Sequence, residues 1–102
     1  MKRGDIVVVS APGDYGKPRP AVVVQADALT DLGTQSIVLC LMSSAEVRSP
    51  LLRIPVEPSD ANGLERLSQI MVEKILTIRR DKVAQAIRHL TDEQLIQLNR
   101  TQ

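Results

Sequence analysis

Aromatic residues are nearly absent from this chain, which has no tryptophan, no phenylalanine and a single tyrosine, Tyr15. A hydrophobic core must therefore be filled by valine, leucine, isoleucine, alanine and methionine. The shortage also argues against functions that need an aromatic-lined groove, such as recognition of proline-rich peptides by an SH3-like module. The peptide-binding hypothesis is therefore weak for this sequence.

Cysteine and histidine are equally scarce, with one of each, Cys40 and His89. A single cysteine forms no internal disulfide, and its place in the apolar run 37–41 predicts a buried strand residue. One cysteine and one histidine, without partners at ligand spacing, do not build a protein-only zinc site of the usual kind. We expect chemistry without a metal or another cofactor, and we interpret His89 as a solvated or interface residue rather than a general base.

Long apolar stretches are missing too, since none approaches the roughly 20 residues that a membrane-spanning helix needs. Residues 1–3 pass at once into a Gly-Asp turn and a strand-like run, without the apolar segment and cleavage site of a signal peptide. We expect a soluble, cytoplasmic protein with no membrane partner. A length of 102 residues suits one core, which predicts a single domain over residues 1–102.

The net charge of +1 does not by itself indicate a nucleic-acid binder. The basic residues nevertheless recur in predicted loops and at strand ends, where one face of the fold can gather several of them. We expect a local basic groove drawn from Arg3, Lys17, Arg19, Arg48, Arg53, Arg66, Lys74, Arg79, Arg80 and Lys82.

Short runs of valine, isoleucine and leucine, bounded by turn-forming residues, predict a mainly β structure. The apolar residues between 68 and 78 change phase near Glu73-Lys74, which fits one bent strand or two strands separated by a bulge. Segment 82–90 fits helical and strand spacing, and we favour a turn followed by a strand. The expected strands cover 5–10, 19–26, 36–42 and 51–56, with loops over 11–18 and 27–35 and a turn at Asn62-Gly63.

The C-terminal segment predicts a short helix, because residues 91–94 have the Thr-x-x-Gln form of a capping box and an apolar stripe follows. About six short strands in so small a chain must close on themselves or leave long unpaired edges. The fold expected is therefore a small SH3-like barrel with a short C-terminal helix.

One loop stands out, because it is rich in glycine, proline and charge and ends in Arg19, held between two prolines. Such a loop does not pack as core, so its arginine is expected to point at something outside the chain. Similar local patterns continue through the sequence in a fixed order. They are Arg3-Gly4-Asp5-Ile6-Val7, Arg19-Pro20-Ala21-Val22-Val23-Val24, Ser43-Ser44, Asn62-Gly63-Leu64, Glu73-Lys74-Ile75-Leu76-Thr77-Ile78 and Leu90-Thr91-Asp92-Glu93-Gln94-Leu95.

This ordered set covers nearly the whole chain and resembles the MazF/PemK toxins of bacterial type II toxin–antitoxin systems. The resemblance implies a barrel of the MazF/CcdB type and a sequence-specific, metal-independent endoribonuclease, or mRNA interferase. In such enzymes the ribose 2′-hydroxyl attacks the adjacent phosphate of single-stranded RNA, leaving 2′,3′-cyclic phosphate and 5′-hydroxyl ends. The resemblance also implies a homodimer inhibited by a MazE/PemI-like antitoxin, whose disordered acidic tail would lie across the basic groove.

Carried over by position, the resemblance implies catalytic roles for Arg19, Ser43 and Glu73. The planar fork of an arginine suits the charged oxygens of a phosphorane. Ser43 stands where the family has threonine, so a hydroxyl remains but its rotamer is less fixed. Glu73 either orients Arg19, acts as a base, or is an exposed ion-pairing residue.

The same comparison suggests RNA contacts from Tyr15, Lys17, Ser44, Lys74 and Arg48. Tyr15 either stacks on a base or covers the mouth of the barrel. Two further functions stay open. One is a CcdB-like toxin that acts on DNA gyrase without catalysis, although the chain lacks the C-terminal tryptophan of that group. The other is a catalytically weakened MazF-like dimer that only binds its antitoxin.

Overall fold

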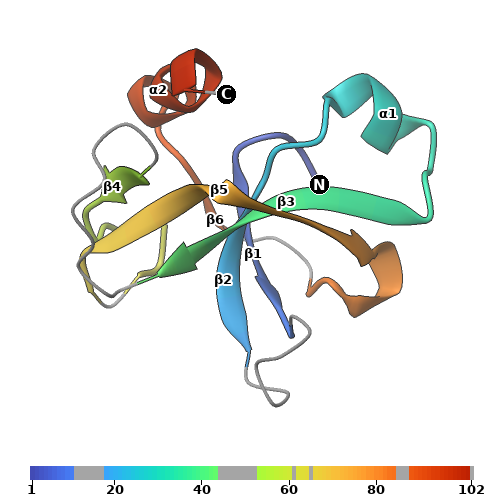
Figure 1. Ribbon diagram of the computed structural model, residues 1–102, viewed down its shortest axis with the longest axis horizontal. Helices are drawn as coiled ribbons and strands as arrows, with labels where there is room; N and C mark the ends of the chain where they lie inside the picture. The colour runs from blue at the N-terminus through green and yellow to red at the C-terminus, as the bar shows by residue number, and fades with distance from the viewer. Residues whose placement is uncertain (11–17, 44–52, 61, 65, 85–87, 102) are drawn as a thin grey trace.

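The computed structural model describes residues 1–10, 18–43, 53–60, 62–64, 66–84 and 88–101. Within these residues, strands form one six-stranded sheet in the order β4-β5-β3-β2-β1-β6, and every strand pair is antiparallel (Figure 1). The strands are β1 (Asp5–Val9), β2 (Arg19–Val23), β3 (Ser36–Ser43), β4 (Arg53–Val56), β5 (Ser68–Arg79) and β6 (Arg88–His89). The helices are α1 (Asp27–Asp31), the 3-10 turn η1 (Arg80–Lys82) and α2 (Asp92–Thr101).

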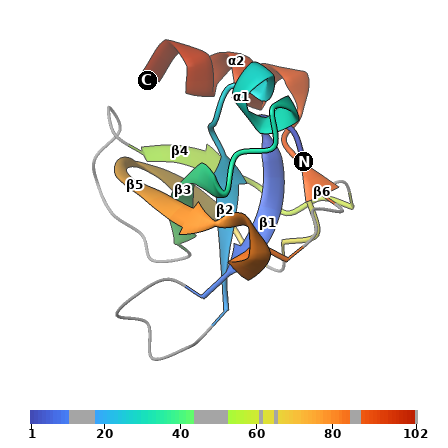
Figure 2. The same cartoon turned by 90° about the vertical axis from the view of Figure 1, so that its right-hand side faces the viewer.

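The sheet curls into a half-barrel with a C-terminal helix, which confirms the predicted mainly β, barrel-like fold. β1 and β2 turn steeply away from β3 and β5, and α1 and α2 lie on the same side of the sheet in Figures 1 and 2. The edge strands β4 and β6 have four and two residues. Short edges of this kind offer little backbone for pairing with another chain.

Each face of the sheet carries its own apolar core, because successive strand residues point to opposite sides. The face that α2 covers, here called the helix face, holds Ile6, Val22, Val24, Cys40, Met42, Ile54, Val56, Ile70, Val72, Leu90 and Leu98. The other, here called the opposite face, holds Val7, Val9, Ala21, Val23, Ile37, Leu39, Leu41, Met71 and Ile78. The curl of the sheet lets valine, leucine and isoleucine fill both cores without large aromatic side chains.

The register between β3 and β5 shifts in the middle of the two strands. Five steps along β5, from Ile70 to Ile75, face only two steps along β3, from Met42 to Cys40. β5 is therefore one continuous strand with extra residues beside β3, and Glu73 lies among them. The predicted bulge is confirmed, and it gives β5 the local bend that the half-barrel needs.

Helix α2 begins with the predicted capping box. The Thr91 backbone N–H donates to Gln94 Oε1 at 2.9 Å, and the Gln94 N–H donates to Thr91 Oγ1 at 3.2 Å. Leu98, on the apolar stripe of this helix, is fully buried in the core of the helix face. The predicted terminal helix is thus stabilised both by its cap and by packing.

The predicted turn at Asn62-Gly63 is also present. Asn62 Oδ1 accepts from the N–H groups of Ser59 and Leu64, and its Nδ2 donates to the Glu57 carbonyl at 2.7 Å. Gly63 has a φ of +67°, and a Cβ there would lie 2.6 Å from a side-chain nitrogen of Arg88. Glycine is needed here both for its backbone conformation and for the close approach of that arginine.

The prediction of a loop over 27–35 is wrong in part, since α1 occupies Asp27–Asp31. Five residues are too few for a helix signal in the sequence, and contacts with distant segments hold this one. The Arg3 N–H donates to Asp27 Oδ1 at 2.7 Å, and Gln25 Nε2 donates to Thr30 Oγ1 at 3.1 Å. Tertiary hydrogen bonds therefore decide the structure of this segment.

The described residues of segment 82–90 agree with a turn followed by a strand. η1 ends at Lys82, Val83 bridges to Val9, and β6 pairs with β1. No helix within the described residues is both long enough and apolar enough to cross a membrane.

Candidate active site

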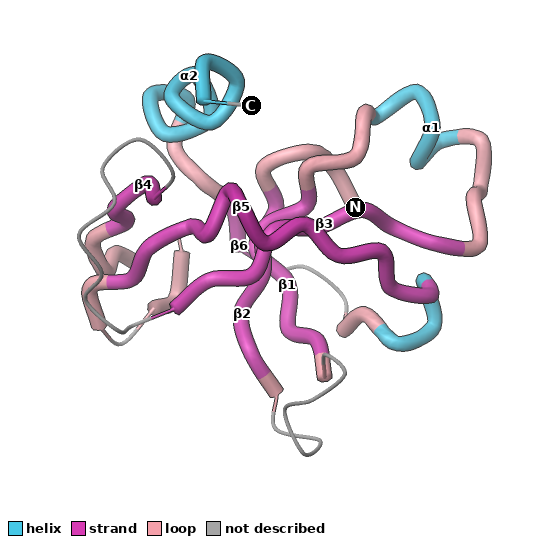
Figure 3. The backbone as a smooth tube through the Cα atoms, viewed as in Figure 1, coloured by secondary structure: helices cyan, strands magenta, loops and turns pink. Residues whose placement is uncertain are grey.

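Two of the predicted catalytic residues lie at the ends of neighbouring strands. Ser43, the last residue of β3, pairs with Gln69 on β5, and Arg19 is the first residue of β2. The pairing of β2 with β3 ends at Ala21 opposite Leu41, two residues short of both Arg19 and Ser43, and beyond it β2 turns away from β3 (Figure 3). Arg19, Ser43 and Gln69, at the ends of these adjacent strands, are here called the site row.

Strand alternation puts the site row on the opposite face. Ala21 and Leu41 stand two residues from Arg19 and Ser43 along their strands, and both belong to the core of that face. Side chains two residues apart in a strand point the same way, so the site row shares the face. Arg19, Ser43 and Gln69 are all half-buried. Polar residues thus continue the apolar core of this face where β2 begins and where β3 ends.

Glu73 carries an ion pair with Arg53, which lies at the start of β4. Arg53 Nε is 2.8 Å from Glu73 Oε1 and 2.9 Å from Oε2. Arg53 pairs with Met71, which belongs to the core of the opposite face, so this arginine lies on that face. Met71 is two residues along β5 from Gln69 of the site row. The side chains of Arg53 and Glu73 are 11% and 29% exposed. The ion-pairing role weighed for Glu73 is thus present, and its partner comes from across the sheet.

The predicted buried cysteine is confirmed, since Cys40 is fully buried on β3. Burial raises the pKa of its thiol from 9.0 to about 11, while the charge of Arg3 lowers this pKa and that of Glu73 raises it. A thiol held in its protonated form is a poor nucleophile. Cys40 therefore belongs to the core and not to the chemistry.

Two arginines hold the fold together, and one of them, Arg3, was expected in the basic groove. Arg3 donates to Asn99 Oδ1 from Nε at 3.1 Å and from one Nη at 2.9 Å, and its other Nη donates to the Val24 carbonyl. Arg88 donates to the Asp60 carbonyl at 2.8 Å. These guanidinium groups connect the N-terminal segment to α2 and a loop to β6.

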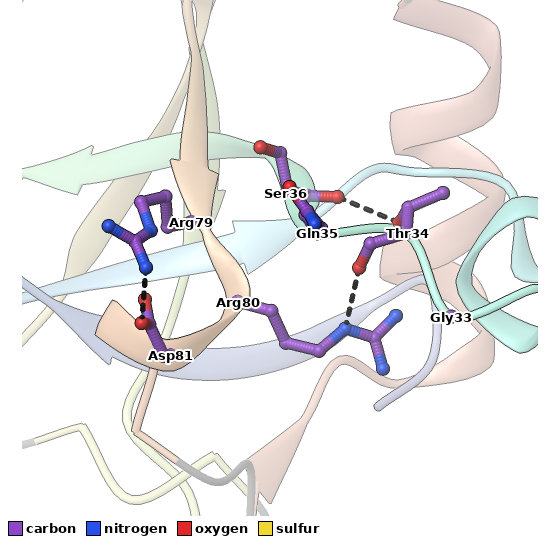
Figure 4. A pocket seen from close by; sticks show the side chains of 7 residues that line it. All are labelled: Gly33, Thr34, Gln35, Ser36, Arg79, Arg80 and Asp81. Carbon is purple, nitrogen blue, oxygen red and sulfur yellow. Dashed lines mark hydrogen bonds and ion pairs between the residues drawn. The ribbon is translucent and has the colours of Figure 1, made fainter.

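A pocket of about 580 Å³ lies at the other end of β3, where Ser36 pairs with Arg79 (Figure 4). There Arg80 Nε donates to the Thr34 carbonyl at 3.0 Å, and an Nη donates to the Thr30 carbonyl at 2.9 Å. Ser36 and Ser43 are seven residues apart, about 23 Å along an extended strand. The pocket is thus remote from the site row, and Arg80 in it caps the end of α1.

The remaining predicted site residues divide into two groups. Lys74 is exposed on β5 beside Glu73, and His89 is exposed on β6, which agrees with its interpretation as a solvated or interface residue. The other predicted RNA contacts, namely Tyr15, Lys17, Ser44 and Arg48, lie outside the described residues. No group of three or more histidine, cysteine, aspartate or glutamate side chains suited to a metal ion occurs among the residues that the structure describes.

Sequence reasoning did not assign Gln69 or Arg53 to the site. The alternation of Ile54 and Val56 in β4 places Arg53 on the face away from their core, which is a signal within the sequence. Its neighbours on that face follow from strand register, which local patterns do not give.

The arrangement of arginine, hydroxyl and ion pair on a curled sheet invites comparison with proteins of known family. The model of the PemK-like, MazF-like toxin of type II toxin–antitoxin systems matches residues 2–101. The chain belongs to this family. A probable endoribonuclease MazF from Mycolicibacterium smegmatis is 34% identical over 101 residues, which cover 98% of this chain and 91% of that protein.

Two further relatives extend the comparison. Endoribonuclease EndoA of Bacillus subtilis is 30% identical over 100 residues, covering 93% of this chain and 84% of that protein. A mycobacterial endoribonuclease, solved in complex with its cognate antitoxin, shares the fold with a TM-score of 0.80 at 16% identity. That match covers 99% of this chain and 89% of the mycobacterial one. The MazF-like fold and family of this chain therefore agree with the prediction from its residues.

Proposed function

We propose that residues 1–102 form one toxin domain that cleaves single-stranded mRNA in the cytoplasm at specific sequences and thereby inhibits growth. The observation that supports this proposal is the site row, in which Arg19 begins β2 and Ser43 ends the adjacent strand β3, each two residues beyond the last paired residues of those strands. Relatives at 34% and 30% identity are named endoribonucleases, which supports the same activity here. The reaction proposed is attack of a ribose 2′-hydroxyl on the adjacent phosphate, giving 2′,3′-cyclic phosphate and 5′-hydroxyl ends, without a metal.

Each residue of the proposed centre has a chemical task. Arg19 directs its planar N–H donors at the phosphate oxygens, which gain negative charge as the 2′-oxygen adds to phosphorus. Ser43 supplies a hydroxyl beside the same phosphate, to donate to one of its oxygens or to relay a proton. Glu73 is the carboxylate candidate for a base, although both of its oxygens lie against Arg53 Nε.

RNA contacts are proposed for Tyr15, Lys17, Ser44, Arg48 and Lys74, as the family resemblance suggests. Lysine and arginine neutralise backbone phosphates, and a tyrosine stacks on an unpaired base. Among them, Lys74 is the one within the described residues, and its exposure supports a phosphate contact.

The partners proposed are a second copy of the chain and a MazE/PemI-like antitoxin with an acidic, disordered tail. A protein of the same fold was solved with its cognate antitoxin, which supports the antitoxin for this chain. An acidic tail would compete with RNA for the arginines of the site.

The gyrase-directed alternative is not favoured. In this chain the C-terminal segment packs back on the protein, since Leu98 is fully buried and Asn99 accepts two hydrogen bonds from Arg3. Family membership points instead to the PemK/MazF toxins.

The test incubates the purified protein with a long RNA of mixed sequence in EDTA, beside Arg19→Ala and Arg79→Ala variants, and maps the cut ends. We expect discrete cuts with 5′-hydroxyl ends, lost in Arg19→Ala and kept in Arg79→Ala, whose arginine lies at the far end of β5. Intact RNA after treatment with the folded, antitoxin-free protein would contradict the proposed activity.

A further inference from the structure

Arg53 is the basic residue of the opposite face whose surroundings leave most of its hydrogen-bonding capacity for a ligand. Its Nε contacts Glu73, and within the described residues this side chain makes no other hydrogen bond or ion pair. A guanidinium has five N–H donors, four of them on the two Nη atoms. Yet the side chain is only 11% exposed, so it is held in place at the surface. A fixed guanidinium with four available donors has the form of a phosphate contact.

We propose that Arg53 binds a backbone phosphate of the RNA and that Glu73 is the positioning residue that aims its guanidinium. This inference rests on the proposed ribonuclease function. It replaces the role of base that the sequence offered for Glu73, because a carboxylate with both oxygens against one donor holds that donor in place.

The geometry of the pair suits this division of roles. Glu73 contacts Arg53 at Nε, and neither Nη atom has a hydrogen-bond partner among the described residues. A phosphate bound at the Nη atoms would therefore use N–H donors that the carboxylate does not occupy. An arginine without an ion pair would lose side-chain rotamer freedom when it binds a phosphate. The ion pair with Glu73 has already removed much of this freedom from Arg53.

The place of Arg53 in the sheet decides which phosphate it meets. Arg19 is on β2 and Arg53 on β4, with β3 and β5 between them in the curled sheet. An RNA strand that crosses this face would bring its reacting phosphate to Arg19 and a phosphate farther along the strand, beyond the adjacent one, to Arg53. Arg53 then fixes the position of the strand and contributes to binding more than to the chemical step.

The chain offers a matched control at the far end of β5. Arg79 forms an ion pair with Asp81 at 2.8 Å, the same distance as Arg53 with Glu73, but the two side chains are 72% and 60% exposed. The variants Arg53→Met and Arg79→Met both keep an apolar stem and remove one positive charge. Arg53→Lys restores the charge without the fork, and thermal unfolding of each variant reports that it is folded.

The measurement is binding to a 2′-O-methyl oligonucleotide of mixed sequence, which lacks the attacking hydroxyl, over a series of salt concentrations. For a single strand, each phosphate contact contributes about 0.7 to the slope of log K against log salt. We expect Arg53→Met to reduce this slope by about 0.7 and the affinity about tenfold. Arg79→Met should change neither, and Arg53→Lys should recover the slope but only part of the affinity.

The role of Glu73 is tested by a double-mutant cycle with Arg53, measured by binding to the same oligonucleotide. If Glu73 positions Arg53, Glu73→Gln weakens binding in the wild-type protein and has no further effect in Arg53→Met. If it is a base instead, Glu73→Gln slows single-turnover cleavage of RNA at saturating protein about 100-fold in either background, which would overturn its positioning role.

The outcomes separate this inference from the proposed function. If the wild-type protein cleaves RNA but Arg53→Met and Arg79→Met have equal slopes of log K against log salt, the inference is overturned. The proposed ribonuclease function is then unaffected. Binding without cleavage would remove the proposed function, while the slope of Arg53→Met still decides the phosphate contact. A wild-type protein that neither binds nor cleaves would overturn both.

Discussion

The two ends of β3 each place an arginine and a carboxylate 2.8 Å apart, yet the two ion pairs differ in every other respect. Near Ser43 the pair joins β4 to β5, 20 residues apart in sequence, and its side chains are 11% and 29% exposed. Near Ser36 the pair joins Arg79 to Asp81, two residues apart, with 72% and 60% exposure.

This difference shows that distance alone says little about what an ion pair does. The exposed, local pair gains little from its charges because water and salt screen them. The Arg53–Glu73 pair, whose arginine side chain is 11% exposed, fixes a long side chain in one orientation on a face that also carries Arg19 and Ser43. The two ends therefore have separate tasks, with binding and chemistry proposed at one and support of the fold at the other.

The largest expected difference between the ends is catalytic. Ser43→Ala should lower the rate of RNA cleavage about 100-fold, because it removes a hydroxyl beside the reacting phosphate. Ser36→Ala, at the other end of the same strand, should change the rate less than about twofold. Ser43→Thr should keep or raise the rate, since a β-branched residue fixes the hydroxyl. Initial rates on one RNA substrate check all three, and equal rates for the two alanine variants would remove the distinction between the ends.

The next difference concerns stability. Arg80→Ala should lower the free energy of unfolding by about 2 to 3 kcal/mol, because the carbonyls of Thr30 and Thr34 lose a charged donor near the end of α1. Arg79→Ala, one residue away, should cost less than about 0.5 kcal/mol. Urea unfolding measures both values, and cleavage per folded molecule should stay unchanged in both variants. An Arg80→Ala protein as stable as Arg79→Ala would show that this arginine does not support α1.

The same contrast explains what the sequence could predict. Strands with dense valine and isoleucine, the capping box of α2 and the bulge near Glu73 all follow from patterns within a few residues, and each is present. Helix α1 was missed because its hydrogen bonds come from Arg3, Gln25 and Arg80, which local sequence does not connect to it.

The candidate site divides in the same way. Arg19 and Ser43 were reached through an ordered resemblance, and each lies two residues beyond the last pair, Ala21 with Leu41, between β2 and β3. Arg53 was one of the ten basic residues of the expected groove. No local pattern shows which of these form hydrogen bonds within the protein and which face outward. That sorting depends on the partner of each guanidinium, and the partners are set by strand pairing between distant segments.

Cys40 lies on β3 between the two ends and gives a smaller, pH-dependent effect. Its thiol ionises near pH 9.0 when exposed and near 11 when buried, so above pH 9 the unfolded chain loses this proton first. The folded state then binds more protons than the unfolded one, and stability falls as pH rises from 9 to 11, by up to about 2 to 3 kcal/mol. Unfolding of the wild type and Cys40→Ala at pH 8 and pH 11 measures this loss by difference, because all other groups titrate in both proteins. Parallel pH profiles would contradict the raised pKa.

The smallest effect expected is the coupling between Arg79 and Asp81. A double-mutant cycle with alanine at both positions should give no more than about 0.5 kcal/mol, and 1 M salt should remove it, because both side chains are mostly in water. The corresponding cycle for Arg53 and Glu73 should give about 1 kcal/mol or more and should keep most of it in salt, since water reaches this pair less. Equal couplings at the two ends would mean that burial does not distinguish the pairs. The orientation of Arg53 by Glu73 would then lose its physical basis.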